Sequence, residues 1–361
     1  MTESRQRVAY FLGANSVDGF ASLYHQWVDQ RTSQAFYTIK GGAGCGKSTL
    51  MGRVARAMEE AGYEVEYIRC SGDPDSLDGI RIPGKGAAMV DGTSPHIMDP
   101  AYTGATGHYI DLGAGYDRKA LFAIREEIIA AAQAYQACYP QAYRCIRSAK
   151  ESRRKGQVPL RTEETLAKTA KRAEAILKRE LKGAAEGQGR RSRRFLGGMT
   201  CKGQLLLDDT VRTLCREGYE IRDEYGLAGD LLRCLEQGFL DRGYDVVSCP
   251  SGEDPGRLAH LLVPGRSLAF VTGRIPEADF RTIRTESLVE KTALQEGRSF
   301  LRLSNRVAGE LLKEAEGYLA QAKENHDALE RLYHPHVDFS LAEEMAQRIT
   351  GEILDLPDTV S

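Results

Sequence analysis

Hydrophobic and polar positions along the chain follow two different periods, and the change between them marks the first predicted elements. Residues 35–39 (AFYTI) form a short apolar and β-branched run that is typical of a buried strand. Further on, Leu50, Val54 and Met58 recur at every fourth position, which predicts an amphipathic helix that ends at Gly62. A glycine-rich segment separates the two runs, so the pattern predicts a strand, a loop and a helix in that order.

Further runs extend this pattern. Residues 63–70 alternate between apolar and polar side chains and residues 86–93 are small and apolar, so both predict strands. Residues 118–150 have a charged helical pattern, and residues 162–181 begin with Thr-Glu-Glu-Thr, which favours a helix N-terminus. We expect these two helices to pair as a hairpin, the second with an apolar face of Leu166, Ala170, Ala173, Leu177 and Leu181.

The two halves of the sequence repeat each other. FLGANSVDGF at 11–20 corresponds to FLGGMTCKGQ at 195–204, and GYEV at 62–65 corresponds to GYDV at an offset of 181. Matches in register over a long stretch indicate an internal duplication. The sequence therefore predicts two tandem α/β units of the P-loop NTPase type, each a mostly parallel sheet flanked by helices with a C-terminal helical hairpin. Their boundaries are 1–185 and 191–361.

Residues 41–48 (GGAGCGKS) satisfy in full the pattern G-x-x-x-x-G-K-[ST] of a phosphate-binding loop. The glycines let the backbone curl until successive N–H groups point into one concavity, and the following helix adds the positive end of its dipole. The strand before the loop and the helix after it are the context that this motif requires. We therefore expect ATP to bind at Gly41, Gly42, Ala43, Gly44, Cys45, Gly46, Lys47, Ser48 and Thr49.

Three side chains at this loop have the chemistry of phosphoryl transfer. Lys47 is placed to reach the β- and γ-phosphates, and the Ser48 hydroxyl is placed to bind Mg²⁺. Asp91 ends a small apolar strand, where a P-loop fold supplies a carboxylate to the metal side; the alternative is a turn residue before Gly92. We assign Lys47 and Asp91 to catalysis, and Ser48 and Asp91 to Mg²⁺.

The general base is not evident from the sequence. Asp91 is followed by Gly92, whereas many hydrolytic P-loop ATPases have a water-activating glutamate there. The base of an ATPase must then come from elsewhere, and the candidates are Asp73, Asp75, Asp78 and His96. Two other functions stay open: a kinase for a small molecule, and a nucleotide-gated interaction module that binds an unknown protein without hydrolysing ATP.

The corresponding segment of the second half, DEYGLAGDLL at 223–232, lacks this chemistry. The lysine position holds Gly229, the serine position holds Asp230, and the position of Asp91 holds Thr272. A carboxylate at the serine position would repel phosphate. The sequence therefore predicts a single nucleotide site in the N-terminal half and a degenerate second unit that serves as a scaffold.

Motifs beyond the loop add a resemblance to a known family. GGAGCGKST, CSGDPDSLDGIRIP, MVDGTSPHIMDP and HYIDLG resemble bacterial proteins, mostly from Firmicutes, that have tandem P-loop domains and are described as ATPases or ATP-binding proteins. The resemblance covers nearly the whole chain. It implies ATP as the nucleotide and places Pro95, His96 and Asp99 near it. The second half in that family commonly keeps a loop lysine, and this sequence departs from that pattern at Gly229 and Asp230.

Composition and charge argue against only a few classes of protein. The chain has 361 residues and a net charge of −2, and it has no apolar run approaching the roughly 18 residues that span a bilayer, so we expect no membrane segment. The eight cysteines form no C-x-x-C pair and do not group with histidines at zinc-ligand spacing. The polar first residues lack the apolar core of a signal peptide, so we expect reduced thiols and a cytoplasmic location.

One stretch departs from the overall charge balance. Residues 144–194 contain 17 Lys or Arg against 6 Glu. Three interpretations are open: a solvated helical hairpin, a lid whose Arg153 and Arg154 approach the phosphates, and a surface for nucleic acid or another anion. The stretch has no aromatic side chain that could stack on single-stranded bases, so the sequence supports the nucleic-acid interpretation only weakly.

Overall fold

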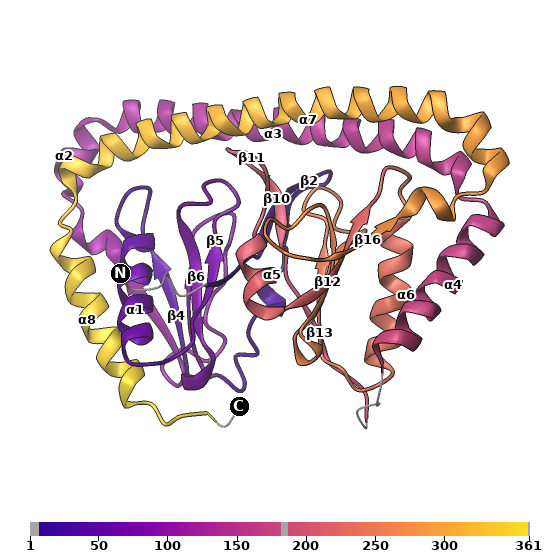
Figure 1. Ribbon diagram of the computed structural model, residues 1–361. Coiled ribbons are helices and arrows are strands. Elements are labelled where there is room, and N and C mark those ends of the chain that lie inside the picture. Colours follow the sequence, from indigo (N-terminus) through magenta and orange to yellow (C-terminus); the bar gives the residue numbers. More distant parts are fainter. Residues whose placement is uncertain (1–6, 182–186, 360–361) are drawn as a thin grey trace.

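Each half of the sequence folds into one six-stranded mixed sheet flanked by helices (Figure 1). This computed structural model describes residues 7–181 and 187–359. In order across the first sheet, the strands are β1 (Val8–Phe11), β5 (Glu66–Arg69), β6 (Leu77–Ile82), β7 (Ala87–Asp91), β4 (Ala35–Lys40) and β8 (Gly107–Asp111). In order across the second, they are β9 (Arg191–Arg193), β13 (Val246–Pro250), β14 (Leu258–Val263), β15 (Leu268–Thr272), β12 (Glu217–Arg222) and β16 (Arg281–Arg284).

The two sheets have the same topology. In the first, β5, β6 and β7 are antiparallel neighbours, and the other neighbouring pairs are parallel. In the second, β13, β14 and β15 are antiparallel neighbours, and the rest are again parallel. The α/β class with mostly parallel sheets is confirmed, and the one-to-one correspondence of strands is consistent with the duplication seen in the sequence.

Helices and small hairpins complete the structure. Four helices pack beside the sheets: α1 (Lys47–Glu60), α4 (Glu163–Glu180), α6 (Ala228–Leu240) and α8 (Ser340–Asp355). Two are long, α3 (Arg125–Gln157) and α7 (Lys291–Tyr333), and two are short, α2 (Arg118–Ala123) and α5 (Asp208–Leu214). The hairpins are β2 (Gly13–Ser16) with β3 (Gly19–Ser22), and β10 (Gly197–Thr200) with β11 (Gly203–Leu206). The 3-10 turns are η1 (Tyr24–Gln26), η2 (Pro83–Lys85), η3 (Leu112–Gly115), η4 (Val158–Leu160), η5 (Pro264–Arg266), η6 (Thr285–Leu288) and η7 (His334–His336).

The two halves exchange helices, so the predicted hairpin of α3 with α4 is wrong. The long helix α3 lies along α7, because its buried Ala142, Ile146 and Ala149 pack against apolar residues of α7. The helix α4 packs on α6 of the second unit, and α8 packs on α1 of the first (Figure 1). Each unit therefore buries a helix that the other half of the sequence supplies, which a local hairpin could not provide.

The exchange predicts a specific effect of a substitution in α8. Ile349 is fully buried in the core of the first sheet, together with Leu50 and Val54 of α1. We expect Ile349→Ala to lower the free energy of unfolding by about 2 kcal/mol and to speed amide hydrogen exchange in α1 but not in α6. Leu354→Ala is the control, because Leu354 lies on the same helix and is 40% exposed. Faster exchange confined to α6 would contradict this packing.

A shared core joins the two units at their centre. Phe11 and Phe195, which are equivalent in the repeat, donate backbone N–H groups to each other's carbonyl oxygens at 2.9 Å. The Asn15 side-chain amide donates to the Met199 carbonyl oxygen at 2.9 Å. Apolar residues of both sheets surround these contacts, among them Phe36, Val90, Leu262 and Val271. The units are thus held together by buried apolar surface as well as by the long helices.

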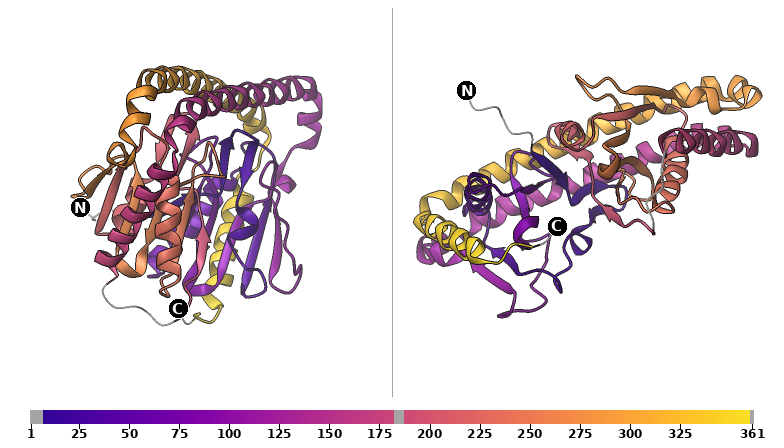
Figure 2. Two further views of the ribbon diagram at one scale, coloured as in Figure 1. Left: turned by 90° about the vertical axis from the view of Figure 1, so that its right-hand side faces the viewer. Right: turned by 60° about the horizontal axis from the view of Figure 1, so that its bottom comes forward.

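The pair of long helices lies beyond one end of the strands, not on a face of either sheet (Figure 2, left). This is the end at which β4 leads into the glycine-rich loop and α1. None of the helices in the described ranges combines the length and the apolar character needed to cross a membrane.

Candidate functional site

The glycine-rich loop, residues 41–46, connects β4 to α1 in the predicted order of strand, loop and helix. Gly44 and Gly46 have φ of 66° and 90°, a left-handed conformation that side chains with a Cβ rarely adopt. A Cβ on Gly41 would lie 2.5 Å from Cys45 Sγ, so the tight curl of the loop needs glycine there as well. Burial raises the pKa of the Cys45 thiol, which therefore stays protonated at neutral pH.

Lys47, the first residue of α1, folds back over this loop. Its Nζ donates hydrogen bonds to the carbonyl oxygens of Gly41 and Gly42 at 3.0 and 2.7 Å. The same Nζ lies 3.6 Å from Asp91 Oδ2. The structure thus brings together the lysine and the carboxylate that the sequence assigned to one site. A largely buried ammonium group above a curled glycine loop is suited to binding an anion.

Asp91 and Ser48 are the other two side chains that the sequence assigned to this site. Asp91 Oδ1 accepts hydrogen bonds from the Thr93 backbone N–H at 2.9 Å and hydroxyl at 2.6 Å, so Asp91 also caps the turn proposed as its alternative role. The Ser48 hydroxyl oxygen accepts a hydrogen bond from the Leu77 N–H at 3.0 Å. Hydroxyl and carboxylate oxygens are ligands that Mg²⁺ prefers, so these residues fit the metal expected with ATP.

The far end of α7 covers the loop, which the sequence did not predict. A Cβ on Gly44 would lie 2.9 Å from the His334 ring, in the turn that follows α7. The Gly42 N–H donates to the Tyr116 hydroxyl oxygen at 2.7 Å, and the Tyr116 ring packs against Tyr333 with centroids 5.6 Å apart. The second half of the chain therefore forms one wall of the site in the first half.

Two ion pairs connect the halves of the chain, each between a lysine of one half and an aspartate of the other. Lys323 of α7 lies 3.5 Å from Asp73 in the first unit, and Lys150 of α3 lies 3.0 Å from Asp254 in the second. Each half contains an Asp-Pro pair at the repeat offset and an Ala-Lys pair in its long charged helical stretch. Sequence spacing did not show that each lysine meets the aspartate of the other half. Lys323 is thus an additional cation at the edge of the first site.

The four candidates for the general base occupy different surroundings. Asp75 is exposed and pairs with Lys202. Asp73 accepts hydrogen bonds from the Asp75 N–H and the Ser76 hydroxyl, so it stabilises the turn that it begins. Asp78 and His96 are both buried, with His96 Nε2 3.3 Å from Asp78 Oδ2. Burial raises the pKa of Asp78, and His96 acts in the opposite direction.

The counterpart loop, residues 223–227, is filled by its own aspartate. Asp223 accepts hydrogen bonds from the backbone N–H groups of Leu227 at 2.9 Å and Ala228 at 3.0 Å, which correspond to Cys45 and Gly46 in the first loop. Its carboxylate also accepts hydrogen bonds from the Thr285 hydroxyl and the Arg257 guanidinium, both at 3.1 Å. A carboxylate of the chain thus occupies the backbone donors that a phosphate would need.

Asp230, at the position of the loop serine, is also engaged. Arg161, just after α3, forms a two-pronged ion pair with it, and one of the two contacts, Nη2 to Oδ1, is 2.9 Å long. Beside this loop, the backbone N–H of Thr272 donates to His260 Nδ1 at 3.2 Å. Burial lowers the pKa of His260 to about 4, so the ring is neutral at neutral pH and adds no positive charge.

The basic stretch lies mainly against the second unit. Arg153 pairs with Glu253 at 3.3 Å, and Arg154 pairs with Glu151 on its own helix at 2.9 Å, so the structure does not bring these two arginines to the glycine-rich loop. Cations of the stretch that pair with carboxylates include Lys150, Arg153, Arg154, Arg161, Lys168, Arg179, Arg190, Arg191 and Arg194. Much of the positive charge is therefore matched within the chain.

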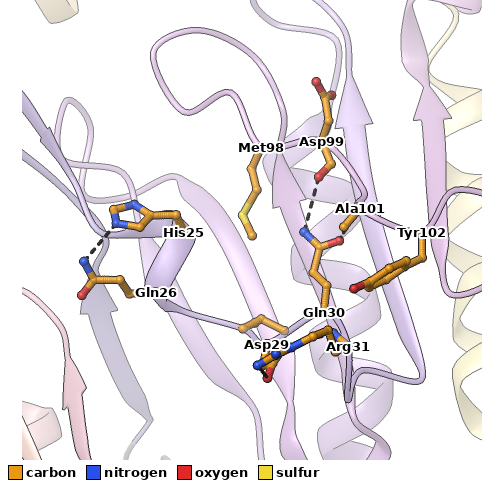
Figure 3. A pocket seen from close by; sticks show the side chains of 10 residues that line it. His25, Gln26, Asp29, Gln30, Arg31, Met98, Asp99, Ala101 and Tyr102 are labelled. Atoms are coloured by element: carbon orange, nitrogen blue, oxygen red, sulfur yellow. Dashed lines mark hydrogen bonds and ion pairs between the residues drawn. The ribbon is translucent and has the colours of Figure 1, made fainter.

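A hollow of about 620 Å³ lies beside the first sheet (Figure 3). In it, the Gln30 amide donates to the Asp99 carbonyl oxygen at 3.3 Å, and the Asp99 carboxylate pairs with Lys40 at 2.8 Å. The hollow is lined by His25, Gln26, Val28, Asp29, Gln30, Arg31, Met98, Asp99, Ala101 and Tyr102. None of these residues belongs to the glycine-rich loop, so we base the function on the loop and its charged neighbours.

Comparison with known proteins covers a small part of the chain. The family model described as Nephrocystin 3, N-terminal, matches residues 21–80, which include the glycine-rich loop and α1. This is less than a fifth of the chain, so the match does not place the protein in that family, and it does not confirm the resemblance to bacterial tandem P-loop proteins. No curated protein and no solved structure matches the chain.

Proposed function

We propose that the chain is an ATPase that binds Mg-ATP at a single site, the glycine-rich loop of its first half. The observation that carries the proposal is the position of Lys47, whose ammonium lies over the loop carbonyls and 3.6 Å from Asp91. The counterpart loop supports a single site, because Asp223 takes its backbone donors. The match of residues 21–80 to a family model includes the loop but does not define the activity.

Each residue of the proposed site has a distinct role. The backbone N–H groups of the loop and of the start of α1 bind the phosphates, and Lys47 stabilises the charge that develops during transfer. Mg²⁺, when bound with ATP, neutralises part of the phosphate charge, and Ser48 and Asp91 are the residues that would hold it. Lys323 and the end of α7 close the site on the side of the second half.

Nucleotide binding requires a change at Tyr116, because its hydroxyl oxygen accepts the Gly42 N–H that would otherwise bind a phosphate. We expect Tyr116→Phe to bind a non-hydrolysable Mg-ATP analogue about threefold to tenfold more tightly, since the variant frees one backbone donor. Isothermal titration calorimetry measures this affinity. Tyr63→Phe is the control, because the Tyr63 hydroxyl bonds Asp358 on the protein surface. Weaker binding by Tyr116→Phe would show instead that the hydroxyl contacts the nucleotide.

A small-molecule kinase is the second candidate. It is favoured by the absence of an acid directly after Asp91, where Gly92 stands and Asp91 itself is engaged by Thr93. A kinase would transfer the phosphoryl group to an acceptor other than water, so the protein alone would release little phosphate.

The proposed ATPase is tested by release of inorganic phosphate from ATP with Mg²⁺, compared with the same reaction in EDTA. Mg²⁺-dependent turnover that Ser48→Ala reduces at least tenfold is the expected result, because the variant lacks the metal-binding hydroxyl. Binding of ATP without release of phosphate would rule out the proposed ATPase activity. A burst of ADP on adding pooled small metabolites would then favour the kinase.

A further inference from the structure

A largely buried cluster of three side chains lies beside the glycine-rich loop. Two of them, Asp78 and His96, are candidates for the general base, and none of the three binds the phosphates or Mg²⁺ in the proposed site. The cluster consists of Cys70, Asp78 and His96, whose sulfur, carboxylate oxygen and ring nitrogen all lie within 4.8 Å of one another. Asp78 and His96 are only 4% and 8% exposed. Cys70 follows β5, Asp78 lies in β6 and His96 follows β7, so three adjacent strands bring the cluster together. Their wide spacing explains why the sequence shows no metal-binding motif.

We propose that Cys70, Asp78 and His96 bind a divalent transition metal ion of the zinc class. Thiolate, imidazole and carboxylate are the side chains that bind zinc, and a thiolate ligand disfavours Mg²⁺. Nitrogen and oxygen ligands at about 2.0–2.2 Å from a tetrahedral ion are separated by about 3.4 Å. His96 Nε2 and Asp78 Oδ2 are already 3.3 Å apart. Three protein ligands leave a fourth position for a water molecule or another ligand.

Neighbouring side chains orient the ligand groups of the cluster and limit their contact with water. Tyr24 donates its hydroxyl hydrogen to Asp78 Oδ2 at 3.0 Å and so orients the carboxylate, as outer partners of metal ligands do. The rings of Phe20 and Tyr24 pack against the His96 ring, with centroids 5.0 and 5.1 Å away, and shield it from water. His96 Nδ1 is buried and has no hydrogen-bond partner among the described residues. The ring's polar contact is with the cluster, through Nε2.

The position of the cluster ties it to the glycine-rich loop. Leu77, next to Asp78, donates its N–H to the Ser48 hydroxyl. A metal ion here would fix the start of β6 and the segment after β7 on the side of the loop that holds Ser48. The ion is distinct from the Mg²⁺ expected with ATP, because its ligands include sulfur and nitrogen and its binding needs no nucleotide. The Cys70 proton leaves as the metal–sulfur bond forms.

Cobalt(II) titration of the full chain, stripped of metal with EDTA and free of nucleotide and of any histidine tag, tests the site. We expect one equivalent of Co²⁺ per chain, with a sulfur-to-cobalt charge-transfer band, the visible bands of a four-coordinate ion, and displacement by one equivalent of Zn²⁺ but not by excess Mg²⁺. Cys70→Ser should lose the charge-transfer band. Asp78→Asn and His96→Gln should weaken Co²⁺ binding at least tenfold.

Cys234→Ser is the matched control, because Cys234 is an exposed free thiol and should leave the spectrum unchanged. Absence of the charge-transfer band from the wild-type protein at saturating Co²⁺ would overturn the proposal, as would a band that survives in Cys70→Ser. The wild-type titration decides the question even where a variant fails to fold. Since no ATP is present, its outcome is independent of the proposed ATPase.

Discussion

Lys47→Ala should lower Mg²⁺-dependent phosphate release by about two to three orders of magnitude, the effect expected when a group that stabilises transition-state charge is removed. In the structure its ammonium makes two hydrogen bonds to loop carbonyls and faces Asp91. The loss should appear mainly in kcat, because the backbone donors of the loop remain available for binding. Steady-state phosphate release over a range of ATP concentrations separates kcat from KM.

Arg56→Ala is the control for this variant. Arg56 lies in the same helix, is exposed, and donates to the Gly52 carbonyl oxygen within α1, so its loss should leave phosphate release within about twofold of wild type. Equal activities of wild type and Lys47→Ala would rule out the glycine-rich loop as the site of hydrolysis.

Asp223→Ala should destabilise the protein by about 2–3 kcal/mol, the cost of leaving largely buried backbone donors without an acceptor. The Asp223 side chain is 6% exposed, and its carboxylate accepts hydrogen bonds from two backbone N–H groups, a hydroxyl and the Arg257 guanidinium. Without it, the N–H groups of Leu227 and Ala228 lose their acceptor in a largely buried loop, whereas the Thr285 hydroxyl still donates to the Arg222 carbonyl oxygen. Urea denaturation followed by circular dichroism measures the change.

Asp279→Ala, at an exposed aspartate of the same half, should change the free energy of unfolding by no more than about 0.5 kcal/mol. Asp223→Asn should lie between the two, since it keeps an acceptor oxygen but loses the charge. A neutral effect of Asp223→Ala would mean that the counterpart loop is not held by its own carboxylate.

Local elements of the first half were predictable because their signals are short in range. Each signal depends only on residues that are close together in the sequence: the apolar run at 35–39, the glycine motif, and the recurrence of Leu50, Val54 and Met58 at every fourth position. The structure has the expected strand, loop and helix. The helix exchange was not predictable in this way. The apolar face of α8 fits α1 and that of α4 fits α6, and periodicity shows that a face is buried without showing which surface covers it.

The same limit applies to the candidate site. Lys47, Ser48 and Asp91 were assigned from a motif and a strand end, and the structure brings them together. Tyr116 was missed because it lies 74 residues from Gly42 in the sequence, in the turn after β8. The end of α7 was missed because that helix starts in the other half of the chain. The role of Asp223 was also missed. A charge difference indicated that the second loop could not bind phosphate, but only the geometry shows that an internal carboxylate fills it.

The number of nucleotides bound per chain tests most directly the claim that one loop is competent and the other is self-occupied. Equilibrium dialysis with a non-hydrolysable Mg-ATP analogue gives this number for wild type, Ser48→Ala and Asp223→Ala. We expect one nucleotide per wild-type chain, and weaker binding of that nucleotide by Ser48→Ala. Asp223→Ala should still bind one nucleotide, because this variant gives the second loop neither the lysine nor the serine of a phosphate-binding loop. Two nucleotides per wild-type chain, or one whose affinity Ser48→Ala leaves unchanged, would contradict the claim.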